Sequence, residues 1–86
     1  MKKLERSLKA VANRRRLGIL KYLKAQGKAP VAEIAGEIDL SFKATSKHLS
    51  VLAAADIVEK DQVGLQMFYR ISAIKTPAIK SIISLL

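Results

Sequence analysis

Three polar side chains between positions 43 and 47 are spaced so that they could contact the edges of DNA bases. At about 100° per residue, Lys43, Ser46 and Lys47 fall on one side of a helix, and Leu49 and Leu52 fall on the opposite side, where a core would bury them. A lysine ammonium can donate to the acceptors on a guanine edge, and a serine hydroxyl can donate or accept. We therefore predict base contacts for these three residues, with an ordinary solvated helix face as the alternative.

His48 is the single histidine of the chain, and the chain has no cysteine. One histidine without cysteine cannot supply a usual zinc-ligand set. Ser46 and His48 point about 200° apart on a helix, so they cannot share a proton as a nucleophile pair. The four glycines form no phosphate-binding motif. We therefore expect no enzyme activity, no metal and no cofactor, and we expect His48 to be packed and hydrogen-bonded.

Positive charge is concentrated near the start of the chain, which carries a formal net charge of +9 over 86 residues. Residues 1–28 hold ten basic side chains and one acidic, residues 29–56 hold two and four, and residues 57–86 hold four and two. Such a concentration favours a polyanion as partner, because each neutralised phosphate releases condensed counterions. A solvated basic face is the alternative. The phosphate contacts that we predict here are Arg14, Arg15 and Arg16.

The composition favours a cytoplasmic protein that associates with itself. No apolar run approaches the roughly 20 residues of a membrane span, and the first six residues lack the apolar stretch of a signal peptide. The absence of cysteine fits a reducing compartment. A domain of this size buries only about 60% of the surface that its unfolded chain exposes, so a partner subunit that extends the core would add stability. We expect an oligomer and no contact with a membrane.

Local signals predict the helices that must position these residues. Leu4 and Leu8 recur at helical spacing in a short first helix. Asn13 is a suitable N-cap for a second helix, and Gly27 ends it. Residues 28–30 then form a connection.

A pair of short helices follows that connection. The first follows Pro30 and bears Ile34 and Ile38. Ser41 is a suitable N-cap for the second, which extends from about Phe42 to Ala54. Two short helices separated by three or four residues form a helix-turn-helix, whose second helix can lie in the major groove of DNA.

The sequence period changes after this pair. Residues 57–62 and 65–72 are rich in β-branched, aromatic and other apolar side chains and flank a tight connection at residues 63–64, which predicts a β-hairpin. Thr76 followed by proline is a helix-start signal. The apolar stripe of this last helix consists of Ile79, Ile82, Ile83 and Leu86.

The predicted order is α-α-α-α-β-β-α, a mainly α chain with one β-hairpin. A hairpin directly after a helix-turn-helix is typical of a winged helix, in which the hairpin reaches toward the DNA backbone. We predict a single winged-helix domain over residues 1–86. A generic helical core whose hairpin only packs is the alternative.

Eight short segments, in this order and spacing over residues 4–71, resemble the ArsR/SmtB family of winged-helix repressors. The segments are LKAVAN (8–13), RLGIL (16–20), EIA (33–35), LS (40–41), SKHL (46–49), VL (51–52), VEK (58–60) and FYR (68–70). The resemblance implies a homodimeric transcription repressor that binds double-stranded DNA, with its fourth helix on an inverted repeat.

By the same resemblance, the groove-facing residues are Phe42, Lys43, Ser46 and Lys47. Phe42 could contact a thymine methyl or fold against the core, and we favour packing. The resemblance also places the dimer interface on the first and last helices, residues 1–11 and 76–86. The side chains predicted there are Leu4, Leu8, Ile79, Ile82, Ile83 and Leu86.

Two departures from the family pattern shape the remaining predictions. The wing tip, residues 61–66, lacks the arginines that similar proteins place there, which leaves a wing contact with DNA open; Ser41, Lys60 and Arg70 are the further phosphate contacts that we predict. Residues 76–86 also lack the ligands of metal-sensing members, so metal sensing is not supported. Two other functions stay open: a winged-helix module that binds an acidic protein, and a DNA-binding protein indifferent to sequence.

Overall fold

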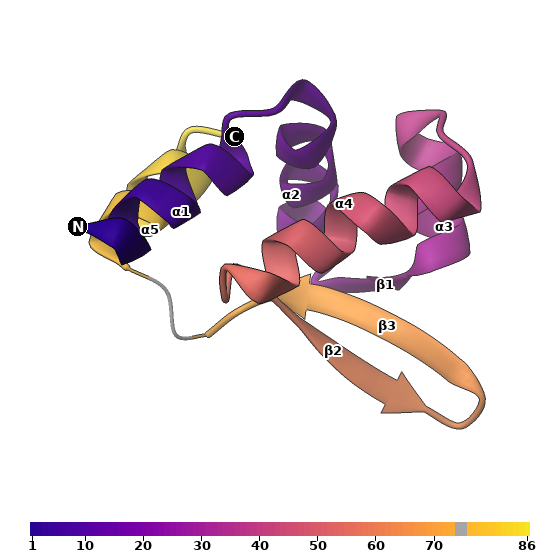
Figure 1. Cartoon of the computed structure of the whole chain (residues 1–86). Coiled ribbons are helices and arrows are strands. Elements are labelled where there is room, and N and C mark those ends of the chain that lie inside the picture. The colour runs from indigo at the N-terminus through magenta and orange to yellow at the C-terminus, as the bar shows by residue number, and fades with distance from the viewer. Residues whose placement is uncertain (74–75) are drawn as a thin grey trace.

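Five helices and three strands follow one another in the computed structural model, which describes residues 1–73 and 76–86 (Figure 1). The order is α-α-β-α-α-β-β-α, and the arrangement is a winged helix-turn-helix, which confirms the predicted fold class. The elements are α1 (Lys2–Val11), α2 (Arg14–Gln26), β1 (Lys28–Pro30), α3 (Val31–Ile38), α4 (Phe42–Ala54), β2 (Val58–Val63), β3 (Gln66–Ile71) and α5 (Pro77–Ser84).

The predicted capping residues begin three of the helices. Asn13, Ser41 and Thr76 each accept a hydrogen bond from the backbone N–H three residues later, at 3.0, 3.1 and 3.4 Å. These bonds satisfy N–H groups that have no partner within the helix. Gly27 ends α2 with a φ of 85°, a backbone angle that glycine adopts without a side-chain clash.

The strand β1 corrects the predicted order. Residues 28–30 were expected to be only a connection, yet they pair antiparallel with β3, and the sheet has the strand order β1-β3-β2. Three residues are too few to show the alternation that reveals a strand, and their hydrogen-bond partners lie far along the chain. The hairpin of β2 and β3 extends well beyond the helices as the wing (Figure 1).

A short turn joins the two helices of the helix-turn-helix. Asp39 adopts the left-handed conformation at the end of α3, with a φ of 55°, which aspartate tolerates better than most residues. From α2, Arg15 donates from Nη1 to the carbonyl oxygen of Ile38 at 2.8 Å. This bond satisfies a carbonyl that the helix end leaves free and ties α2 to the turn.

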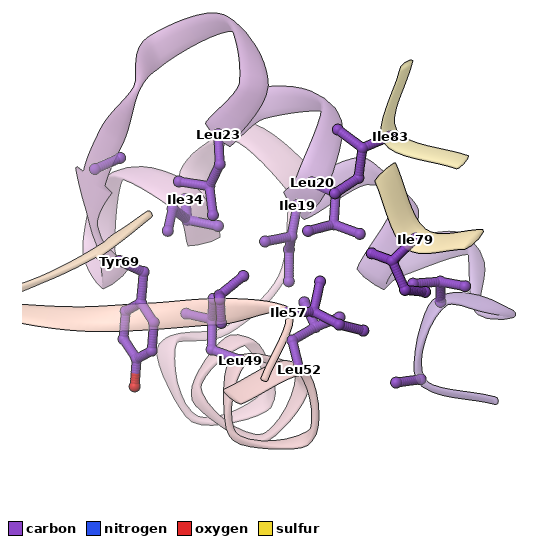
Figure 2. Packing of buried hydrophobic residues seen from close by; sticks show 14 of the residues in the cluster. Ile19, Leu20, Leu23, Ile34, Leu49, Leu52, Ile57, Tyr69, Ile79 and Ile83 are labelled. Atoms are coloured by element: carbon purple, nitrogen blue, oxygen red, sulfur yellow. The ribbon is translucent and has the colours of Figure 1, made fainter. Parts of the chain in front are cut away.

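Figure 2 shows the core, to which every helix and the sheet contribute side chains. Leu49 and Leu52 of α4 are fully buried in it, as predicted. Ile79 and Ile83 of α5 are only 1% and 6% exposed within the chain itself. This corrects their assignment to the dimer interface: α5 folds back onto its own subunit and uses these two side chains as core residues.

Arg16 and His48 join three helices. The half-buried Arg16 guanidinium donates to the carbonyl oxygens of Lys9 and Ala10 at the end of α1, and its Nη1 lies 3.3 Å from Nδ1 of His48 on α4. Burial, followed by the charges of Arg16 and Arg15, lowers the pKa of His48 below its ordinary value of 6.5. A neutral imidazole can accept at Nδ1, whereas a charged imidazolium cannot.

Replacing a core leucine tests the role of α4 in the fold. Leu49→Ala should lower the free energy of unfolding by about 2–5 kcal/mol, because it leaves a cavity in a closed core. Leu65→Ala, at a fully exposed leucine of the wing tip, should change it by less than about 0.5 kcal/mol. Urea unfolding followed by circular dichroism measures both, and equal losses would contradict this packing.

The pH dependence of stability tests the Arg16–His48 contact. Because folding lowers the pKa of His48, the unfolded chain binds its proton first, and stability should fall as the pH drops below about 6.5. His48→Gln keeps an acceptor for Arg16 but does not titrate, so it should lose less stability between pH 7 and pH 5 by thermal unfolding. Identical slopes for the two proteins would show that His48 does not carry the effect.

Candidate nucleic-acid interface

The outer face of α4 carries the side chains that were predicted to contact bases. Lys43 and Lys47 are exposed and Ser46 is half-buried, while Thr45 on the opposite face is buried with Leu49 and Leu52. The predicted base-contact residues lie together around a shallow depression. Its lining residues are Phe42, Lys43, Ser46, Lys47, Ser50 and Val51.

Ser50 and Val51 also line this surface. The helical wheel places Ser50 on the same side as Lys43 and Lys47, so its position agrees with the sequence, whereas Val51 is the residue that sequence reasoning missed. Val51 follows Lys47 by one helical turn, so helical spacing could have identified it. Val51 is exposed even though it is apolar, and apolar side chains are more often assigned to a core. The outer face of α4 is therefore longer and less polar than predicted.

Phe42 does not pack into the core, which corrects the favoured prediction. Its side chain is 60% exposed. A helical wheel places it near Leu49, but Phe42 is the first residue of α4, and side chains lean toward the N-terminus of their helix. The ring therefore lies beyond the part of α4 that the core covers.

The three consecutive arginines of α2 have different surroundings. Arg14 is exposed to solvent. Arg15 is exposed but donates to the carbonyl oxygen of Ile38 beside the helix-turn-helix turn. Arg16 is engaged by α1 and His48. Arg14 and Arg15 thus present charge to solvent near the turn, whereas Arg16 serves the fold, and we leave it out of the proposed phosphate contacts.

Arg70 lies in an ion-pair network on the wing. Its Nε donates to Asp61 at 2.6 Å and its Nη2 pairs with Glu59 at 2.8 Å, and Ser72 donates to the other oxygen of Glu59 at 2.8 Å. The bond from Arg70 holds the pKa of Asp61 below its ordinary 3.8, and the two carboxylates raise the pKa of Arg70. Two carboxylates offset the charge of this arginine, so we also leave Arg70 out of the proposed phosphate contacts.

Two further predicted phosphate contacts remain accessible. Lys60 is exposed on β2. Ser41 is exposed at the N-terminus of α4, where its Oγ accepts from the N–H of Ala44. A hydroxyl that accepts one hydrogen bond can still donate its own proton. Phosphate contacts by Ser41 and Lys60 therefore stay predictions, and the exposure of both side chains is compatible with them.

The wing tip is apolar rather than basic. Val63 and Leu65 are exposed there, next to Gly64, whose positive φ of 63° forms the turn. The tip carries none of the arginines that would favour the minor groove.

The outer side of α1 is an exposed apolar surface. Met1, Leu4 and Leu8 are exposed and line an open depression on this helix. From α5, Ile82 and Leu86 are partly buried against the core, and Leu85 at the end of the chain is exposed. An exposed row of large apolar side chains is typical of a contact surface, and it is available to a second molecule.

The part of the chain that the structure describes offers no group of three His, Cys, Asp or Glu side chains placed to hold a metal ion. Among the same residues, no helix is both long enough and apolar enough to cross a bilayer.

The family assignment comes from both sequence and structure. The sequence model described as "bacterial regulatory protein, arsR family" matches residues 13–60, which include the helix-turn-helix and the start of the wing. No curated protein sequence matches the chain.

Solved structures of transcription regulators superpose on almost the whole chain. HlyU from Vibrio cholerae, in its reduced form, is 34% identical with a TM-score of 0.83, and the match covers 99% of this chain and 85% of HlyU. A homodimeric winged helix-turn-helix DNA-binding domain from Mycobacterium bovis, described as a possible ArsR-family regulator, is 32% identical with a TM-score of 0.83 and coverages of 98% and 74%. The transcriptional repressor PagR of Bacillus anthracis is 25% identical with a TM-score of 0.81 and coverages of 98% and 92%.

These similar proteins are transcription regulators and not enzymes. The family model spans more than half of the chain, and the fold matches those of the solved structures over nearly its full length. The chain therefore belongs to the arsR family of bacterial regulatory proteins, which are winged helix-turn-helix DNA-binding transcription regulators.

Proposed function

We propose that this chain is a transcription repressor that binds an inverted repeat in DNA as a homodimer. The observation that carries the proposal is the outer face of α4. It presents Lys43, Ser46 and Lys47 to solvent around one shallow depression, while the inner face is held in the core. A helix fits into the major groove, where base edges differ in their donors and acceptors.

The surroundings of α4 supply the contacts that would hold it in the groove. Ser41 caps the N-terminus of α4, where free N–H groups favour a phosphate. Arg14 and Arg15 project near the turn, and Lys60 is exposed on the wing. Phosphate contacts set the register of the protein on the duplex, and base contacts then select the sequence.

A homodimer would place two copies of α4 on one face of DNA. The exposed apolar side of α1, with Leu4 and Leu8 at its centre, gives each subunit a surface that a symmetric partner would cover. The related domain from Mycobacterium bovis is described as homodimeric. A two-fold axis with recognition helices about 34–36 Å apart would match an inverted repeat of half-sites one helical turn apart.

Repression is the sign of regulation that we propose. The related PagR is described as a transcriptional repressor. A dimer that lies along one face of an operator would block access of other proteins to that stretch of DNA. Such a protein would act in the cytoplasm, where the bacterial chromosome lies.

Base contacts and phosphate contacts should respond differently to substitution. Lys43→Ala should weaken binding to a duplex selected from a random pool by about 1–3 kcal/mol and leave binding to unrelated duplexes nearly unchanged. Arg14→Ala should weaken both classes of duplex alike and reduce the slope of log K against log[salt] by about 1. Fluorescence anisotropy over a series of salt concentrations measures both effects.

Other results of that experiment would identify the alternative functions. A selection at about 150 mM salt that enriches no sequence, together with binding to every duplex, would indicate a protein indifferent to sequence. No binding to any duplex would favour a module that binds an acidic protein. A specific duplex whose affinity Lys43→Ala leaves unchanged would contradict the proposed role of α4.

A charge on α1 tests the proposed dimer. Leu8→Glu should convert the protein to a monomer at micromolar concentration, because the interface would have to bury an unpaired carboxylate. Affinity for a full inverted repeat should fall, while affinity for an isolated half-site should not. Sedimentation velocity measures the mass, and Leu65→Glu on the wing is the matched control. A Leu8→Glu variant that stays dimeric would place the interface elsewhere.

A further inference from the structure

Phe42 is an exposed aromatic side chain beside the groove-facing lysines. The other phenylalanine, Phe68, is half-buried on the sheet, with Nζ of Lys28 lying 5.4 Å from the centre of its ring. Phe42 instead is 60% exposed and lines the same depression as Lys43, Ser46 and Lys47. An open phenyl ring in a basic surface has no role in the core of this chain.

We infer that Phe42 selects a thymine by contacting its 5-methyl group in the major groove. This inference rests on the proposed function, since it requires α4 to lie in the groove. A phenyl ring can neither donate nor accept a conventional hydrogen bond, so it cannot read most of the base edge. Among the bases of unmodified DNA, thymine alone presents an apolar group in the major groove, its C5 methyl.

The position of Phe42 on α4 gives the ring access to the floor of the groove. Phe42 is the first residue of the helix, and the N-terminal part of a recognition helix is the part that contacts base edges. Ser46 follows one turn later, about 6 Å along the axis, which corresponds to about two base steps. Phe42 and Ser46 thus place an apolar and a polar group before base pairs about two steps apart.

DNA fits this surface better than an apolar groove of another protein does. Lys43 and Lys47 line the same depression as Phe42, and burying their ammonium groups against an apolar partner would cost free energy without compensation. Against DNA, the ammonium groups meet acceptors and phosphates while the ring meets a methyl group.

Replacing thymine by deoxyuridine tests the inference directly, because the exchange removes the methyl and leaves the hydrogen-bonding edge intact. Each thymine of the selected duplex is exchanged in turn, and binding of the wild-type protein is measured by fluorescence anisotropy. At one thymine position in each half-site, the exchange should weaken binding about four-fold. This is the loss expected when one buried methyl group is removed. Phe42→Ala should bind the thymine and uracil forms of that position equally.

Control variants separate this effect from general loss of binding. Leu65→Ala, at an exposed aliphatic residue of the wing, should keep the full thymine-to-uracil difference. Circular dichroism melting should show that Phe42→Ala is folded. If the variant does not fold, the thymine exchange series with the wild-type protein still tests the inference.

Three outcomes would overturn the inference. If no thymine exchange weakens wild-type binding, or if Phe42→Ala keeps the same penalty, Phe42 does not read a methyl group, although the proposed function stands because the duplex is still selected and bound. If no duplex is selected at all, the proposed function fails and this inference fails with it.

Discussion

Because one face of α4 is buried in the core, only the opposite face is left exposed to contact a ligand. Leu49 and Leu52 lie in the core, and Thr45 lies with them because its hydroxyl donates to the carbonyl oxygen of Ser41 at 2.8 Å and so is not left without a partner. Rotating α4 about its axis would expose two leucines and bury two lysines. The outer surface of α4 is therefore set by packing, and its chemistry follows from the residues that packing leaves outside.

The charge of this molecule is divided between structural and accessible groups. Arg16 binds helix-end carbonyls and His48, and Arg70 binds two carboxylates on the wing. Both contribute to the formal charge of +9, yet neither is open to a polyanion as Arg14, Lys43 and Lys47 are. Composition therefore overstates the accessible positive charge. Among the exposed basic residues, Arg14 and Arg15 lie at the start of α2 and Lys43 and Lys47 on α4.

The apolar side chains of the two terminal helices differ in exposure. Ile79 and Ile83 of α5 complete the core of the subunit, whereas Leu4 and Leu8 of α1 remain exposed. The subunit thus has a closed core of its own and still carries an apolar surface. This combination is what the proposed homodimer requires, namely a folded subunit with an apolar surface left to pair through α1.

Local sequence signals determined most of the elements of this protein. The caps at Asn13, Ser41 and Thr76, the stop at Gly27 and the helical spacing of apolar residues act within one or two turns, so the sequence could reveal the helices, the wing and the side of α4 that carries the lysines.

Tertiary structure alone decided the features that depend on distant partners. The strand β1 exists because β3 offers it hydrogen bonds, and Arg70 is engaged because the hairpin register sets Glu59 opposite it. Phe42 is exposed because the core ends before the first turn of α4, and Ile79 is buried because α5 folds back. A periodic pattern indicates which side of a helix is apolar. It does not indicate where the neighbouring elements lie that cover that side.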